Sequence, residues 1–173
     1  RVVLCDVDPA RVARFAARCR AAFGALRIET AGDATTLVSA VPLLAIATTA
    51  VRPHLDALAP RSLRTVLHLS LRDLAPAVIL AADNVADDVD HVCRAETSLH
   101  LAAEAVGRRD FIGRTLPAIL VGAAPSGGHP DRPTIFSPFG LGILDLAVAE
   151  LVCERAATEG VGTRLPFAAR VTG

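Results

Sequence analysis

The chain has 173 residues, of which 52% are hydrophobic and 21% charged, so it can bury the core of about one globular domain and is not a disordered chain. Its formal net charge is zero, which gives no electrostatic reason to expect a nucleic acid or a membrane as partner. All 18 basic residues are arginines, so no lysine of this chain can form a Schiff base. The cysteines lie far apart in the sequence, at Cys5, Cys19, Cys93 and Cys153. This spacing predicts free thiols in a reducing, cytoplasmic compartment rather than disulfides or a metal site.

Segments typical of strands and helices alternate along the chain. Residues 2–5 form a short apolar run typical of a buried parallel strand, and Asp8 followed by Pro9 predicts the start of a helix. Further strands are predicted at residues 26–29, 43–48, 65–70, 84–87 and 134–136. Helices are predicted at residues 9–23, 33–38, 53–58, 74–81, 91–105, 111–121 and 141–157, the last with Leu144, Val148, Leu151 and Val152 facing inward. This alternation predicts an α/β, Rossmann-type doubly wound parallel sheet with right-handed crossovers.

Asp6 directly follows the first predicted strand and is the first candidate binding residue. In dinucleotide-binding folds, an acid at the end of the second strand accepts hydrogen bonds from the adenosine ribose and repels a 2′-phosphate. This pattern favours NAD over NADP as cofactor, with Val7 in the same turn as a second contact. The alternative is an ordinary aspartate at a strand end, since Asp8 already provides the helix cap.

The glycine-rich loop that should accompany such an acid is not found in the sequence. A GxGxxG pattern is expected about 20 residues before the acid, but only residues 1–5 precede Asp6. Gly140 and Gly142 form a GxG, but Asp145 stands where the third glycine would be, so this is not the loop. We therefore expect residues 1–173 to form a partial NAD-binding domain whose first strand and phosphate loop lie upstream.

Polar groups follow three of the predicted strands. Thr48 and Thr49 lie at the end of one strand and Leu71 at the end of another, at the edge where doubly wound sheets bind ligands, so we expect them to line the path of the cofactor. Simple capping of the following helices is the alternative. Ser137 and Phe139 follow the last strand and are expected to border the nicotinamide end.

Arg72 and Asp73 come just after the strand at residues 65–70. A carboxylate there can activate a water or take a proton, and an arginine can hold a substrate carboxylate. Equally, Asp73 can be the N-cap of the helix at residues 74–81, beside a solvated arginine. Acids at residues 87–90 suit a helix N-terminus better than a cation, and no metal is predicted.

Five short motifs occur in an order that resembles the ornithine cyclodeaminase/mu-crystallin family. They are Cys-Asp-Val-Asp-Pro at residues 5–9, Ala-Thr-Thr-Ala at 47–50, His-Leu-Ser-Leu-Arg-Asp-Leu-Ala-Pro at 68–76, Asp-Asn-Val-Ala-Asp-Asp-Val-Asp-His at 83–91 and Phe-Ser-Pro-Phe-Gly-Leu-Gly-Ile-Leu-Asp-Leu-Ala at 136–147. The resemblance covers nearly the whole chain. Within the family, the third and fifth motifs look like the branch of N-(2-amino-2-carboxyethyl)-L-glutamate dehydrogenases, which make 2,3-diaminopropionate for siderophores and peptide antibiotics.

The chain departs from cyclodeaminases at two of these motifs. Cyclodeaminases typically carry Gly-x-Asp-x-Pro-Gly-Lys after the histidine strand, whereas here Asp73 is followed by Leu-Ala-Pro without the lysine. They usually show Asp-Ser-Thr-Gly where this chain has Ser-Pro-Phe-Gly at residues 137–140. Asp73 falls nearest to the family's catalytic aspartate, although the local spacing differs.

The resemblance implies an NAD-dependent enzyme acting on a CH–NH bond. NAD would take a hydride from the glutamate Cα, and a water activated by Asp73 would hydrolyse the imine to 2-oxoglutarate and 2,3-diaminopropionate. It also implies an upstream domain that binds substrate and forms a homodimer. Alternatives are an ornithine cyclodeaminase or an imine or amino-acid dehydrogenase of the family. A methyltransferase using S-adenosylmethionine and a non-catalytic nucleotide-binding relative are alternatives of other classes.

Overall fold

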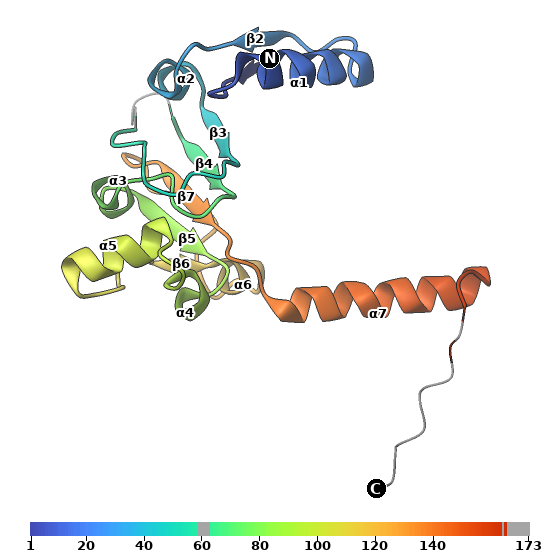
Figure 1. The fold of residues 1–173 in the computed structure, drawn as a ribbon. Helices are drawn as coiled ribbons and strands as arrows, with labels where there is room; N and C mark the ends of the chain where they lie inside the picture. Colours follow the sequence, from blue (N-terminus) through green and yellow to red (C-terminus); the bar gives the residue numbers. More distant parts are fainter. Residues whose placement is uncertain (59–62, 164, 166–173) are drawn as a thin grey trace, which may run out of the picture. The chain divides into compact units, whose positions relative to one another are not determined.

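The structure is a computed structural model that describes residues 1–58, 63–163 and 165. The chain divides into two compact units, residues 1–139 and residues 140–173. The strands found among the described residues all lie in the first unit (Figure 1). The candidate site residues predicted above lie between Asp6 and Phe139, so they all belong to the first unit.

A parallel sheet of five strands forms the centre of the first unit (Figure 1). Its order is β3 (Leu43–Ile46), β4 (Thr65–His68), β7 (Thr134–Ser137), β5 (Asp83–Ala86) and β6 (Arg114–Thr115). All neighbouring pairs are parallel, so the carboxyl ends of these strands share one edge of the sheet. Doubly wound sheets bind their ligands outside this carboxyl edge.

A second, two-stranded parallel sheet is formed by β1 (Val2–Leu4) and β2 (Ile28–Thr30). Helix α1 (Pro9–Ala22) connects its strands, and α2 (Ala34–Ala40) leads on to β3. Among the described residues, β1 pairs only with β2 and β3 pairs only with β4. The α/β fold with parallel strands is confirmed.

The core lies against the five-stranded sheet. Val66 and Ile135, on the adjacent strands β4 and β7, are fully buried. Helix α3 (Pro76–Leu80) and helix α5 (Ser98–Val106) pack against each other, and each contributes buried side chains. Burial of these side chains fixes the strands whose carboxyl ends carry the candidate site.

Two predicted helix starts are confirmed by side-chain caps. Asp8 accepts a hydrogen bond from the backbone N–H of Ala10 at 2.8 Å and precedes α1. Asp33 accepts one from the N–H of Thr36 at 2.7 Å and precedes α2. In both cases a carboxylate satisfies an orphan donor of the first helical turn.

The helix predicted at residues 53–58 is wrong. This segment contains no helix, and Leu55 instead forms an isolated parallel bridge with Leu74. The N–H groups of His54 and Leu55 both donate to the carbonyl of Asp73, each at 2.9 Å. Tertiary hydrogen bonds therefore take the donors that a helix would have used.

The helix predicted at residues 91–105 is two helices, α4 (Val89–Val92) and α5. Between them, Ala95 and Glu96 adopt left-handed φ angles of 52° and 54°. The Oγ1 of Thr97 then accepts from the N–H of His100 at 3.0 Å and starts a new helix. The prediction at residues 111–121 is also corrected, because β6 precedes a short helix, α6 (Leu116–Leu120).

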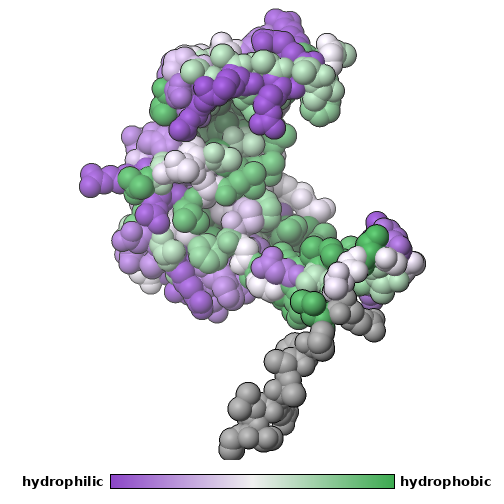
Figure 2. Space-filling model, turned by 45° about the vertical axis from the view of Figure 1, so that its right-hand side comes forward, coloured by the Kyte–Doolittle hydropathy of each residue, from purple (hydrophilic) through white to green (hydrophobic). Residues whose placement is uncertain are grey.

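The second unit contains one described helix, α7 (Gly142–Glu159), close to its predicted bounds. The inward face predicted for it is wrong for this structure. Leu144, Val148, Leu151 and Val152 are between 52% and 59% exposed, and no described residue of α7 is buried. Figure 2 shows hydrophobic residues at the surface of this helix. No other described element of the unit covers its apolar side chains.

All four cysteines are free thiols, as predicted, with Cys93 buried and Cys153 exposed. None of the described helices is both long enough and apolar enough to cross a membrane.

Candidate functional site

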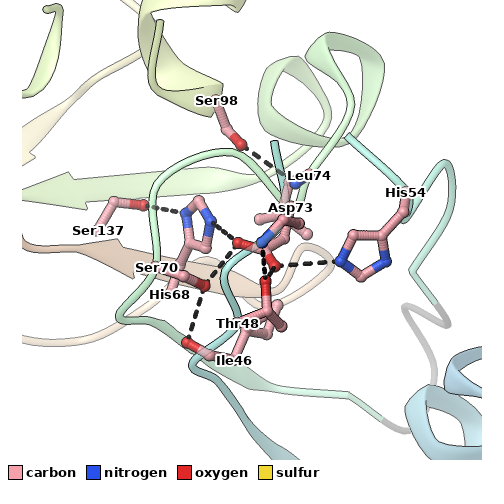
Figure 3. Close-up of polar contacts among 10 residues, drawn as sticks. Ile46, Thr48, His54, His68, Ser70, Asp73, Leu74, Ser98 and Ser137 are labelled. Atoms are coloured by element: carbon pink, nitrogen blue, oxygen red, sulfur yellow. Dashed lines mark hydrogen bonds and ion pairs between the residues drawn. The ribbon is translucent and has the colours of Figure 1, made fainter. Parts of the chain in front are cut away.

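The carboxylate of Asp73 is the centre of a polar network at the carboxyl ends of β3, β4 and β7 (Figure 3). Its Oδ1 accepts from the hydroxyl of Thr48 and lies 3.1 Å from Nε2 of His54. Its Oδ2 accepts from the hydroxyl of Ser70 at 2.5 Å and lies 3.2 Å from Nε2 of His68. Asp73 is fully buried, so each oxygen is satisfied by side chains and not by solvent.

Burial and hydrogen bonding act in opposite directions on the pKa of Asp73. Burial raises this pKa, while the hydrogen bonds from His68, Ser70, Thr48 and His54 lower it, and together they prevail. The pKa of Asp73 is therefore held well below the usual range of an aspartate, and the group is an anion at neutral pH. A buried anion is stable here because four side chains surround it.

His68 links this carboxylate to the neighbouring strand. It is the last residue of β4, is only 1% exposed, and its Nδ1 lies 3.1 Å from the hydroxyl of Ser137 at the end of β7. Since the anionic Asp73 accepts from Nε2, a neutral His68 carries its proton on Nε2 and accepts from Ser137 at Nδ1. The histidine thus joins the ends of two adjacent strands.

Backbone contacts hold the loop that carries Asp73 from two sides. On one side the carbonyl of Asp73 accepts from the N–H groups of His54 and Leu55, and the carbonyl of Leu55 accepts from the N–H of Ala75 at 3.0 Å. On the other side Ser98, the first residue of α5, accepts from the N–H of Leu74 at 3.1 Å. The position of the carboxylate is therefore set by main-chain as well as side-chain contacts.

The structure excludes the alternative in which Asp73 caps the following helix. Helix α3 begins at Pro76 and its N-cap residue is Ala75, with no side-chain cap. The side chain of Asp73 instead binds four other side chains. A capping role for Asp73 is thus excluded, and a catalytic role stays a prediction.

Asp6 lies directly beyond the carboxyl end of β1, as predicted, and is exposed. Its Oδ1 accepts from the N–H of Asp8 at 2.9 Å, while Oδ2 has no partner among the described residues. Val7 is fully exposed beside it. One carboxylate oxygen of Asp6 is thus free to accept from a diol, which fits the ribose contact predicted from the sequence.

The remaining predicted cofactor residues differ in how accessible they are. Thr49 is exposed, and Leu71 is 43% exposed while its carbonyl accepts from the N–H of Ser98. Thr48 and Ser137 use their hydroxyls within the network, on Asp73 and His68. The N–H of Phe139 donates to Asp87 at 2.9 Å. A contact of these residues with a cofactor stays a prediction.

Arg72 does not face the Asp73 carboxylate. Its NH2 donates to the carbonyl of Ala95 at 2.8 Å, and its NH1 lies 3.7 Å from a carboxylate oxygen of Glu96. Its Nε is buried without a partner. The guanidinium therefore holds the left-handed turn between α4 and α5, and its predicted contact with a substrate carboxylate stays untested.

The candidate residues predicted from the sequence omit His54, His68 and Ser70, which the structure places in the network. The sequence predicts a helix at residues 53–58, which the structure does not contain. The contact of His54 with Asp73 depends instead on the bridge between Leu55 and Leu74. No local sequence signal predicts such a bridge. Ser70 offered a weak signal, because it stands three residues before Asp73 at the end of a predicted strand.

Two further features of the described residues lie outside the network. A hollow lined by residues that include Asp56, Ala81 and Pro133 adjoins the amino ends of β5 and β7, the edge opposite to Asp73. We therefore do not assign the chemistry to it, because parallel sheets bind ligands at their carboxyl edge. No group of three or more His, Cys, Asp or Glu side chains suited to a metal ion occurs in the described part of the chain.

Neither a family model nor a curated protein matches this sequence. Solved structures do match it. A Δ1-pyrroline-2-carboxylate reductase of Thermococcus litoralis, in complex with NADH and L-proline, has a TM-score of 0.81 and 22% identity over 94% of this chain and 52% of its own. The iminosuccinate reductase of Paracoccus denitrificans, in complex with NAD+, has a TM-score of 0.80 and 24% identity over 96% of this chain and 52% of its own.

A third matching structure is that of CmnK, with a TM-score of 0.76 and 25% identity over 96% of this chain and 50% of its own. The chain thus spans about half the length of each of these three proteins. The similarity extends over nearly all of this chain and shows that its fold is the Rossmann-like fold found in part of each of them.

Proposed function

We propose that this chain is the NAD-binding part of an oxidoreductase that acts on the CH–NH bond of an amino acid, in the ornithine cyclodeaminase/mu-crystallin family. The observation that carries the proposal is the buried, anionic Asp73 network at the carboxyl edge of a parallel sheet. Such a charged cluster costs free energy to bury, and strongly perturbed carboxylates gather at functional sites. Two structurally similar proteins carry NADH or NAD+ and have names that designate reductases.

For the substrate we propose N-(2-amino-2-carboxyethyl)-L-glutamate, with 2-oxoglutarate and L-2,3-diaminopropionate as products. The motifs around Asp73 and Ser137 support this branch. A cytoplasmic location and a place in siderophore or antibiotic synthesis are part of the same proposal.

In this proposal the residues of the chain bind, orient and move protons. NAD, when bound, accepts the hydride that leaves the substrate Cα. Asp6 holds the adenosine ribose through its free carboxylate oxygen, and Val7, Thr48, Thr49, Leu71, Ser137 and Phe139 line the remaining path. The Asp73 network then stands beside the imine, where an anion favours the positive charge on the imine nitrogen.

We propose that the substrate-binding and dimer-forming half lies upstream of this chain. The share of each matching protein that is covered supports this, since it is about half. The sheet supports it independently, because β1 and β3 each pair on one edge only among the described residues. A strand between β1 and β3, followed by a glycine-rich loop, would join the two sheets and supply the pyrophosphate site.

The proposal is tested by offering substrates to the full-length protein with NAD and following NADH. We expect NADH and 2-oxoglutarate to form in equal amounts from N-(2-amino-2-carboxyethyl)-L-glutamate, and no turnover of ornithine. Turnover of ornithine alone would make the protein a cyclodeaminase and contradict the substrate assignment. Binding of NAD with no turnover of any amino acid would favour a non-catalytic relative.

A further inference from the structure

We propose that His54 is the proton-transfer group of this site and that Asp73 holds His54 in place instead of reacting itself. The inference rests on the proposed function and assigns a step of it, the hydrolysis of the imine, to a residue that the sequence did not single out. It follows from the different exposure of the three groups that meet at the network: His54, His68 and Asp73 (Figure 3).

Asp73 is poorly placed to act as the base. Its side chain is fully buried, and both oxygens already accept hydrogen bonds, Oδ1 from Thr48 and His54, Oδ2 from Ser70 and His68. These bonds also stabilise the anion, and a strongly stabilised carboxylate is a weak base. A water could reach it only after several of these contacts had broken.

His68 is equally enclosed. It is 1% exposed, with Nε2 on Asp73 and Nδ1 on Ser137, so neither ring nitrogen has room for a water or a substrate. Its role is to tie the carboxylate to β7. Among the described residues of the network, this leaves one imidazole that can reach solvent.

His54 has the exposure and orientation that a proton-transfer group needs. Its side chain is 41% exposed, and its ring lies on the opposite side of the carboxylate from His68 (Figure 3). Nε2 lies 3.1 Å from Oδ1 of Asp73, and no described residue forms a hydrogen bond or ion pair with Nδ1. Because the anion accepts from Nε2–H, neutral His54 presents its lone pair at Nδ1, on the side away from the carboxylate.

The main chain prepares this geometry before any ligand binds. The N–H of His54 donates to the carbonyl of Asp73, and the adjacent bridge between Leu55 and Leu74 holds the two loops together. A carboxylate that fixes the tautomer and orientation of a histidine, and stabilises its protonated form, is a common device for proton transfer. Among the described residues, Asp73 is the only titratable side chain that forms a hydrogen bond or ion pair with His54.

The proposed step is the hydrolysis of the imine left by hydride transfer. A water oxygen bonds to the imine carbon, the C=N pair moves to nitrogen, and one proton of the water passes to Nδ1 of His54. His54 then gives this proton to the nitrogen as the C–N bond breaks. The hydroxyl becomes the carbonyl of 2-oxoglutarate, its proton goes to solvent, and His54 returns to its neutral form.

The test uses His54→Gln in the full-length protein, with His129→Gln as the control. His129 is an exposed histidine near the amino end of β7, at the other edge of the sheet. We expect His54→Gln to form NADH at the wild-type rate in the first turnover but to release 2-oxoglutarate about 100- to 10,000-fold more slowly. The acid limb of the pH profile of kcat should disappear with it, and His129→Gln should match wild type.

A second variant separates chemistry from folding. In His54→Ala, added imidazole should restore part of the 2-oxoglutarate release, which a purely structural histidine would not allow. Wild-type 2-oxoglutarate release by His54→Gln, or slowing of the first-turnover NADH formation as well, would overturn the assignment to hydrolysis. Failure of the wild-type protein to form any NADH would instead contradict the proposed function.

Discussion

Asp73 combines complete burial with a full charge, and four side chains surround it at the end of β4. Because they donate to the anion, they lower its pKa despite the burial, which acts to raise it. The buried charge of Asp73 is therefore stable only while these four hydrogen-bond partners are in place. Its substitution should therefore affect folding as well as activity.

Asp73→Asn should lower the free energy of unfolding at pH 7 by about 3–5 kcal/mol, because the amide group would face donors that need an acceptor. The pKa of Asp73 is lower in the folded chain than in the unfolded chain, so this stabilisation is present above the ordinary aspartate pKa of about 3.9 and is lost as pH falls below it. Urea unfolding at several pH values measures this effect.

The matched control is Asp131→Asn, since Asp131 is an exposed aspartate. It should change the free energy of unfolding by less than about 0.5 kcal/mol at any pH. Equal stability of Asp73→Asn and wild type at pH 7 would mean that the network contributes nothing to folding.

At the scale of elements, side-chain hydrogen bonds from loops and helix ends determine where the helices near the site begin. Helix α5 begins after Thr97, whose Oγ1 accepts from His100 and also donates to the carbonyl of Val92. Thr97 is 3% exposed, so water cannot replace these bonds. The start of α5 in turn places Ser98 on the loop of Asp73.

Thr97→Val keeps the volume of the side chain but removes both hydrogen bonds, and should lower the free energy of unfolding by about 1–2 kcal/mol. Thr35→Val, at an exposed position of α2, should change it by less than about 0.5 kcal/mol. Urea denaturation of the two variants compares them directly. A smaller loss for Thr97→Val than for Thr35→Val would show that this cap does not stabilise the fold.

The sequence predicted those elements whose signals are local. The caps at Asp8 and Asp33 and the strand predicted at residues 65–70 depend on neighbouring residues. The structure confirms both caps and contains the strand as β4, which ends two residues earlier at His68. The loop at residues 53–58 and the break at Ala95 could not be predicted in this way. Both depend on hydrogen bonds to residues distant in the sequence, to Asp73 in one case and Arg72 in the other.

The same distinction explains what could be predicted of the site. Thr48 and Asp73 follow strands of the five-stranded sheet and Asp6 follows a strand of the two-stranded sheet, and each parallel sheet brings such residues to its carboxyl edge. No local sequence pattern predicts the contact of His54 with Asp73 or the exposed face of α7. Periodicity assigned α7 an inward face, but it does not specify what covers that face.

At the scale of the whole molecule, β1 and β3 each pair with one neighbouring strand only among the described residues. The chain spans about half the length of the proteins of similar fold described above. Both facts agree with the proposal that another part of the protein completes this domain. The proposed function depends on whether the completed domain binds NAD.

Calorimetric titration of the full-length protein with NAD tests this most directly. We expect one NAD to bind per chain, no heat with S-adenosylmethionine, and about 10- to 100-fold weaker NAD binding in Asp6→Ser, because the ribose loses hydrogen bonds to a charged acceptor. Binding of S-adenosylmethionine without NAD, or NAD binding that Asp6→Ser leaves unchanged, would contradict the account.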